Sequence, residues 1–385
     1  MIRKTIFWAH LISGVTAGLV IFMMSITGVL LTYERQIEKI FQRNDYLDNE
    51  LRLPTALPID KLIVKGEYVN SNLSIDSVIV TNHPGAPLTL RAGRTFSIEL
   101  NPFTGEEMHI GSPHLENFFR VVTNWHRWFN TNGDDRVLGR AITGLCNLIF
   151  LFLIFSGLYL WLPKTWRWFM FKIRLKLYAK PPNGRARDYN WHHFFGIWCA
   201  VPLAVIVATA TVFNYSWANN LVYQVYGEEV PQRSLTSTSE QARIDSKNVD
   251  VISTKYLNLN ELLQSAQQYT EQIFGNWETI SIALPAINED QVIFEINQSL
   301  GGQPQKQFTL TLDRNSGEQL SLTGLSDASP AQRARRIIRF LHTGEVLGFW
   351  GQTIAGVVSF ATLLMVWSGL ALAYRRLIKP LFTFI

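Results

Sequence analysis

The stretch TIFWAHLISGVTAGLVIFMMSITGVLLTY, residues 5–33, decides the fold because it contains no Asp, Glu, Lys or Arg. A helix of about 20 apolar residues spans a bilayer, so this run predicts a transmembrane helix. The uncharged runs 141–163, 189–227 and 346–374 are each long enough as well. The sequence therefore predicts a membrane protein with four spans, in which the long polar segments between spans form two soluble domains.

Lys and Arg are distributed unevenly around these runs. The N-terminus, the segment between the second and third spans and the C-terminus together carry 13 basic residues and 1 acidic residue. The rest of the chain carries 22 basic and 29 acidic residues. Because basic flanks mark the cytoplasmic side, we expect both termini in the cytoplasm and both soluble domains on the outer face. The net charge of +5 then belongs to the membrane flanks and implies no nucleic-acid partner.

The predicted organisation is an α+β membrane protein. Transmembrane helices are expected at 5–34, 139–163, 192–217 and 346–374, outer domains at 35–138 and 218–344 with interfacial helices at 113–129 and 330–342, and cytoplasmic segments at 164–191 and 375–385. Alternating patterns predict strands at 75–81, 87–91, 95–100, 278–284, 291–297 and 307–312, and composition predicts helices at 59–65 and 260–274.

The two halves of the chain are similar, which indicates a tandem repeat of span, outer domain and span. His10-Leu-Ile-Ser-Gly14 matches His192-His-Phe-Phe-Gly196, and the same offset aligns Thr27 with Thr209. Ser156-Gly157 matches Ser368-Gly369 in the second and fourth spans. Ser97–Glu106 resembles Thr309–Glu318, each a strand entering a turn in which Gly105 or Gly317 takes a positive φ.

The repeat also relates two histidines that follow helix starts. Ser112-Pro113 and Ser329-Pro330 each combine a hydroxyl cap with proline at the first helical position. His126 and His342 lie 13 and 12 residues after those prolines. We therefore expect these histidines at equivalent places on two interfacial helices at the outer membrane face.

Four histidines thus lie at the ends of predicted spans, two at each face. Their depths allow only the pairs His10 with His192 and His126 with His342. A histidine within a membrane is energetically costly unless it has a partner, so it indicates a functional site. Two facing pairs predict two haems, each bound by two imidazoles. His193 is an alternative to His192; the two lie about 100° apart around the helix, so only one can face the site, and the match of His-x-x-x-Gly favours His192. No Cys-x-x-Cys-His motif is present, so the haem would be of b type.

Haem propionates need cations nearby. On the outer interfacial helices, Arg127 and Arg339 are the candidate partners, with Arg120, Arg335 and Arg336 close in sequence. Lipid headgroups and an anionic substrate are alternative partners for the same arginines.

Four spans, the His-x-x-x-Gly motif at the first and third, and two strand–Thr/Ser-Gly-Glu turns resemble the PepSY-associated transmembrane proteins of bacterial inner membranes. The resemblance covers nearly the whole chain, and its layout is close to the FoxB-like siderophore reductases. It implies two PepSY-like periplasmic domains, two haems b held by His10, His192, His126 and His342, and one-electron reduction of Fe(III)-siderophore to release iron. No Gly-x-Gly-x-x-Gly follows a strand, so the electron donor would be a quinol or a cytoplasmic reductase.

An alternative function stays open from the sequence. The outer domains could bind a periplasmic protease or another envelope partner, without enzymatic activity. Haem content separates the two hypotheses, because only the first gives the paired histidines a role.

Overall fold

A computed structural model of the chain describes residues 1–50, 56–69, 75–93, 96–164, 167–231, 256–286 and 289–382. The remaining parts of the predicted outer domains, of the segment 164–191 and of the tail lie outside the described residues. The chain divides into two compact units. The helical bundle comprises Met1–Glu34, Glu116–Glu228 and Ala334–Ile385, and the sheet unit comprises Arg35–Leu115 and Glu229–Arg333.

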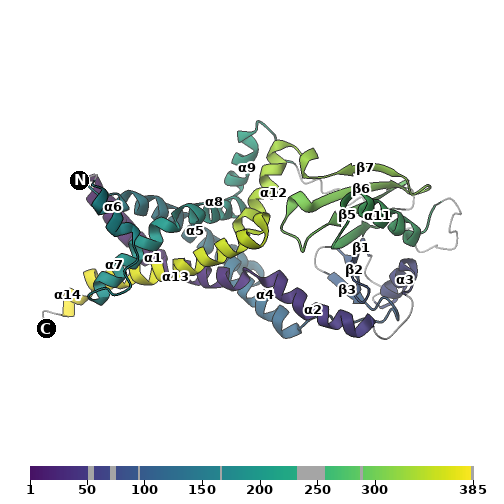
Figure 1. Cartoon of the computed structure of the whole chain (residues 1–385), viewed down its shortest axis with the longest axis horizontal. Coiled ribbons are helices and arrows are strands. Elements are labelled where there is room, and N and C mark those ends of the chain that lie inside the picture. Colours follow the sequence, from purple (N-terminus) through teal and green to yellow (C-terminus); the bar gives the residue numbers. More distant parts are fainter. Residues whose placement is uncertain are drawn as a thin grey trace. The chain divides into compact units, whose positions relative to one another are not determined.

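The bundle is built from long apolar helices (Figure 1). Three of them are long and apolar enough to cross a membrane in the part of the chain that the structure describes: α1 (Ile2–Leu31), α5 (Arg136–Trp161) and α13 (Gly348–Leu377). The pair α7 (Gly184–Trp198) and α8 (Ala200–Asn214) passes the same test if it forms one span. Helix α1 packs against both α5 and α13, and α13 packs against α7. The prediction of four spans agrees with this arrangement when the bent pair counts as one.

The third span differs from the predicted straight helix at 192–217. Its two helices meet at an angle of 66° around Cys199. Pro202 lies just after this bend; proline donates no backbone hydrogen bond, and its ring clashes with the carbonyl four residues earlier. The helix also begins earlier than predicted, at Gly184, because the Asn183 side chain caps it by accepting from the Ala186 N–H at 2.8 Å. The predicted loop 164–191 therefore contains the start of α7, and also α6 (Trp168–Leu175).

The shorter helices confirm the capping argument. Ser112 Oγ accepts from the backbone N–H of Leu115 at the start of α4 (Pro113–Trp128). Ser329 Oγ accepts from Gln332 N–H at the start of α12 (Pro330–Thr343). The sequence did not predict α2 (Glu34–Glu50) or α9 (Ser216–Val225). The remaining short helices are α14 (Lys379–Phe382) and the 3-10 turns Gly133–Asp135, Pro304–Lys306, Leu325–Asp327 and Glu345–Leu347.

The sheet unit contains one antiparallel sheet in the order β3-β2-β1-β4-β5-β6-β7. The strands are β1 (Ser77–Thr81), β2 (Leu88–Ala92), β3 (Phe96–Leu100), β4 (Thr279–Ala283), β5 (Gln291–Asn297), β6 (Gln307–Asp313) and β7 (Gln319–Thr323). All but β7 were predicted. The prediction of two separate outer domains is wrong in this respect, because β1 pairs with β4 and joins strands from both halves of the chain. The pairing satisfies the backbone groups of two strands that would otherwise be edges.

Helices α3 (Ile59–Val69) and α11 (Leu259–Phe274) supply the rest of the sheet unit's core. Leu62 and Leu262 from these helices pack in one buried cluster with Val78, Ile282 and Phe294 from the strands. The predicted turns are also present, with Gly105 at φ 69° and Gly317 at φ 72°. The sheet unit thus has its own core.

Candidate functional site

The structure brings the four predicted histidines together as two pairs, both within the bundle. The ring centroids of His10 and His192 are 6.3 Å apart, with the ring planes at 85°. The centroids of His126 and His342 are 6.4 Å apart, with the planes at 56°. These are the pairs that the membrane topology predicted, and all four rings are partly buried.

One nitrogen of each ring in the first pair is held by a fixed acceptor. His10 Nδ1 lies 2.8 Å from Ser156 Oγ, and this hydroxyl donates its own hydrogen to the Phe152 carbonyl. The hydroxyl oxygen must therefore accept from His10 Nδ1–H. His192 Nδ1 lies 3.0 Å from the carbonyl oxygen of Met365, which can only accept. Both rings thus carry their proton on Nδ1, which leaves the Nε2 lone pair for a metal ion.

The second pair is held in the same way. His126 Nδ1 lies 2.8 Å from Thr27 Oγ1, whose hydrogen is used by the backbone carbonyls of α1. His342 Nδ1 donates to the Ile206 carbonyl at 2.9 Å, and Thr209 Oγ1 lies 3.4 Å away. Thr27 and Thr209 are the two threonines that the sequence comparison aligns. The hydrogen bonds assign the same tautomer to all four imidazoles.

The ring separation fits one metal ion between two imidazoles. A metal–nitrogen bond of about 2 Å on each side, and about 1 Å from each nitrogen to its ring centre, gives roughly 6 Å between centroids. An edge-to-face ring contact has a similar separation, so distance alone does not decide. The shared tautomer, with the proton on Nδ1, distinguishes a metal site from a ring contact. An edge-to-face ring contact does not need this tautomer, whereas a metal ligand requires an unprotonated Nε2.

Two imidazoles do not complete a metal site on their own. Within the described residues, no group of three or more His, Cys, Asp or Glu side chains could hold a metal ion. Further ligands would have to come from a cofactor, and the four nitrogens of a porphyrin fill that role. The chemistry of the donor set therefore fits haem better than a bare metal ion.

A cavity of about 830 Å³ surrounds the first pair. His10 and His192 both line it, and so do glycines from the helices that face it. A Cβ atom at Gly157 would lie 3.3 Å from His10 Cε1, and one at Gly369 would lie 3.0 Å from His192 Cε1. Both glycines therefore give the imidazoles the space that they occupy. The volume is within the range of cofactor pockets.

The same cavity is lined by cations at the end of the bundle that carries both chain termini, which we name the basic end. Its basic lining residues are Arg3, Lys4, Lys164, Arg174, Arg185, Arg375 and Arg376. Arg376 lies over the rings of Phe7 and Trp8, so the end of α13 adjoins the start of α1. Trp161 also lines the cavity; its buried indole N–H has no partner among the described residues. A carboxylate in this cavity would meet both cations and an unused donor.

The two pairs lie far apart along α1. His10 is on this helix, and Thr27, which contacts His126, follows it by 17 residues. At about 1.5 Å per residue, the two levels are roughly 25 Å apart. This separation is close to the thickness of a bilayer's hydrocarbon core, about 30 Å.

Guanidinium groups gather near the second pair. Burial and the neighbouring Arg140, Arg339 and Arg136 lower the pKa of Arg127. Arg140 donates to the carbonyls of Phe213 and Asn214 and so secures the end of α8. The predicted residues Arg127 and Arg339 are therefore neighbours, and each keeps part of its side chain open to solvent.

His193 differs from His192 in its surroundings. Its Nδ1 donates to the Tyr189 carbonyl at 2.9 Å, and its ring stacks on Tyr189 with 4.0 Å between centroids. His192 is the ring found opposite His10. The geometry therefore favours His192 over His193 as the partner of His10.

The sequence missed several residues that hold the site. The Met365 and Ile206 carbonyls leave no side-chain signal in a sequence. The roles of Ser156, Gly157 and Gly369 did have a signal, since the repeat aligned Ser156-Gly157 with Ser368-Gly369, but the alignment did not say what these residues contact. Trp161 is one of 12 tryptophans, and nothing in the sequence distinguishes it from the others.

The family model described as the PepSY-associated TM region matches residues 7–376, nearly the whole chain. No curated protein matches the chain significantly.

Proposed function

We propose, from the premise that this chain belongs to the PepSY-associated transmembrane family, that it binds two haems b and carries electrons across a bacterial inner membrane to reduce ferric siderophore. The observation that carries the proposal is the common Nδ1 tautomer of two facing histidine pairs, roughly 25 Å apart along the membrane-spanning helices. A structural role for the rings would not require four matching tautomers.

The residues have separate tasks in this proposal. His10 and His192 would hold one haem, and His126 and His342 the other, each through Nε2. Haem bound in this way supplies a one-electron carrier without an open coordination position. Ser156, Thr27 and the Met365 and Ile206 carbonyls hold the imidazoles in orientation and keep them basic at Nε2. At the basic end, Trp161 Nε1–H and the cations of the cavity would bind carboxylates of the cofactor.

The direction of electron flow follows from charge. The basic end carries the cytoplasmic excess of Lys and Arg, so electrons would enter at the His10–His192 pair. They would leave near the His126–His342 pair, where Arg127 and Arg339 would attract an anionic ferric chelate or cofactor carboxylates. The ferric ion gains one electron there, and the resulting Fe(II) binds the hard oxygen ligands of a siderophore weakly, so the iron is released.

Haem content tests the first part of the proposal. Protein purified from haem-supplied cells is expected to give two haems b per chain in a pyridine haemochrome assay. His10→Ala or His192→Ala should leave one haem, and His126→Ala or His342→Ala should leave the other, with a different spectrum. A colourless preparation would contradict the proposal and leave the partner-binding alternative.

Reoxidation tests the second part. Dithionite-reduced protein in oriented vesicles should be reoxidised by ferric siderophore added at the face opposite the basic end. His126→Ala should abolish that reaction, while His109→Ala, which changes a histidine in the sheet unit, should leave it unchanged. Reoxidation only from the side of the basic end would overturn the assigned direction.

A further inference from the structure

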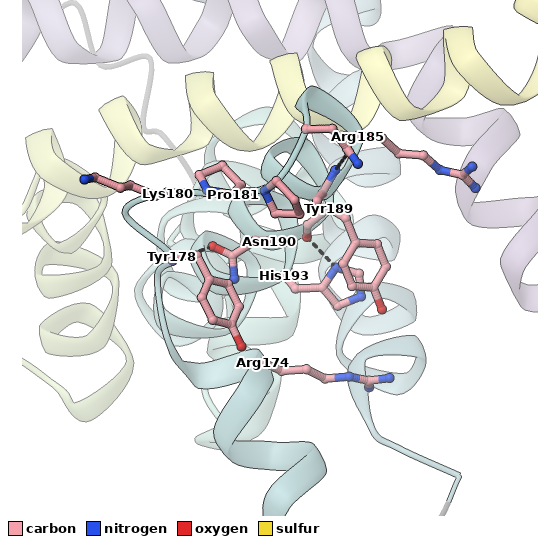
Figure 2. A pocket seen from close by; sticks show the side chains of 11 residues that line it. Arg174, Tyr178, Lys180, Pro181, Arg185, Tyr189, Asn190 and His193 are labelled. Atoms are coloured by element: carbon pink, nitrogen blue, oxygen red, sulfur yellow. Dashed lines mark hydrogen bonds between the residues drawn. The ribbon is translucent and has the colours of Figure 1, made fainter.

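A second cavity lies at the basic end of the bundle, and no part of the proposed function uses it. Its volume is about 470 Å³; it is partly open, and the start of α7 and the chain that leads into it from α6 line it. Figure 2 shows Tyr178 on one side and Tyr189 with His193 on the other. Arg174, Arg185, Tyr189 and His193 line this cavity and the larger one as well, so the two cavities adjoin.

His193 presents a hydrogen-bond acceptor in this cavity. Its Nδ1 donates to the Tyr189 carbonyl at 2.9 Å, so the proton is on Nδ1 and the lone pair is on Nε2. The stacked Tyr189 ring, 4.0 Å away, fixes the plane of the imidazole. The ring centroids of His193 and His192 are 6.2 Å apart. A molecule that donates an O–H to His193 would therefore lie close to the His10–His192 pair.

We propose that this cavity binds the phenolic head group of a membrane quinol, with His193 Nε2 accepting its O–H. The rings of Tyr178 and Tyr189 and the side chains of Pro181, Pro182 and Ala186 supply apolar walls for one aromatic ring. The cavity lies at one end of helices long enough to cross a membrane, which is where the head group of a membrane-dissolved quinol is found. A nucleotide fits less well, because phosphate would bind the N–H groups at the start of α7, and the Ala186 N–H there already donates to the Asn183 side chain.

The role of this ligand as electron donor rests on the proposed function. Oxidation of one quinol to quinone releases two electrons and two protons. The electrons would pass one at a time to the one-electron acceptor of the neighbouring His10–His192 pair, and two ferric siderophores would consume them. Water at the basic end would take both protons.

Binding can be measured without electron transfer. The full-length chain in nanodiscs, reduced beforehand with dithionite, is titrated anaerobically with decylubiquinol, and tryptophan fluorescence quenching gives the Kd. Saturable binding is expected in protein made with or without haem. His193→Leu should raise the Kd about five- to tenfold, the loss of one hydrogen bond. Tyr178→Ala should weaken binding as well, whereas His109→Leu should not change it.

A photoreactive azidoquinone provides a test that does not depend on the folding of variants. Reduced to its quinol, it should label the peptide that contains residues 178–193 of the unmodified protein, and excess decylubiquinol should prevent the labelling. Labelling elsewhere, binding that is insensitive to both His193→Leu and Tyr178→Ala, or displacement by a flavin nucleotide alone would overturn the inference. If the protein binds no haem and still binds the quinol at this peptide, the proposed function is contradicted and the quinol site is supported.

Discussion

Removing the hydroxyl group of Ser156 tests how the bundle holds the first histidine pair. Ser156 is buried, with 6 % of its surface exposed, and its Oγ accepts from His10 Nδ1–H at 2.8 Å. In Ser156→Ala this N–H loses its acceptor inside the bundle. An unsatisfied buried donor costs about 1–3 kcal/mol. Loss of such a partner from a metal-bound imidazole lowers metal affinity about 10- to 100-fold.

Ser368 provides the matched control. It occupies the position equivalent to Ser156 in the sequence comparison, and it too is buried. Its hydroxyl donates to the Met365 carbonyl, and His192 donates to the same carbonyl. Ser368→Ala therefore leaves His192 Nδ1 its acceptor, and we expect little change. Ser156→Thr keeps a hydroxyl group and should restore most of what Ser156→Ala loses.

The assay is haem retention during dialysis against apomyoglobin, followed by absorbance. Ser156→Ala should lose the haem of the first pair about 10- to 100-fold more readily than the unmodified protein, while the haem of the second pair is retained. Equal loss from both pairs, or equal effects of Ser156→Ala and Ser368→Ala, would refute the assignment of Ser156 as the partner of His10.

Three other changes test separate parts of the structure. Gly369→Ala would place a Cβ 3.0 Å from His192 Cε1, so it should displace that imidazole and reduce the haem content of the first pair, while the second pair keeps its haem; a haemochrome assay measures both. Asp188→Asn removes a fully buried carboxylate that contacts Arg375 at 2.5 Å. It should lower the free energy of unfolding by about 1–3 kcal/mol, less than the loss of a fully buried ion pair, because Arg375 is partly exposed. An unchanged thermal midpoint would show that this ion pair does not stabilise the bundle. The backbone N–H groups of Ser316 and Asn315 lower the pKa of Asp313 below its ordinary value of 3.8. The contribution of Asp313 to stability is therefore complete above pH 3.8 and is lost as the pH falls through the lower pKa of the folded state. Asp313→Asn should remove part of the acid sensitivity of the sheet unit, measured by circular dichroism.

The sequence by itself predicted four apolar segments long enough to span a membrane and one of the paired histidines near an end of each. Uncharged runs give the length of a span, and helical rise converts the sequence position of His10 or His126 into a depth. The Ser-Pro starts gave α4 and α12 because capping is local chemistry. Strands β1 to β6 were predictable for the same reason, since alternation depends on the neighbouring residues alone. The prediction of a straight third span is wrong, because the helix bends by 66° just before Pro202, which donates no backbone hydrogen bond.

Only the tertiary structure decided which groups face each other. Depth says nothing about the rotation of a helix, so it could not choose between His192 and His193; the packing of α7 on α13 made that choice and aimed His192 at the Met365 carbonyl. The junction of β1 with β4 was likewise beyond the sequence, because strand pairing across such a distance depends on shape and burial in the assembled sheet. Local patterns fixed what each segment is, and long-range packing fixed what each segment touches.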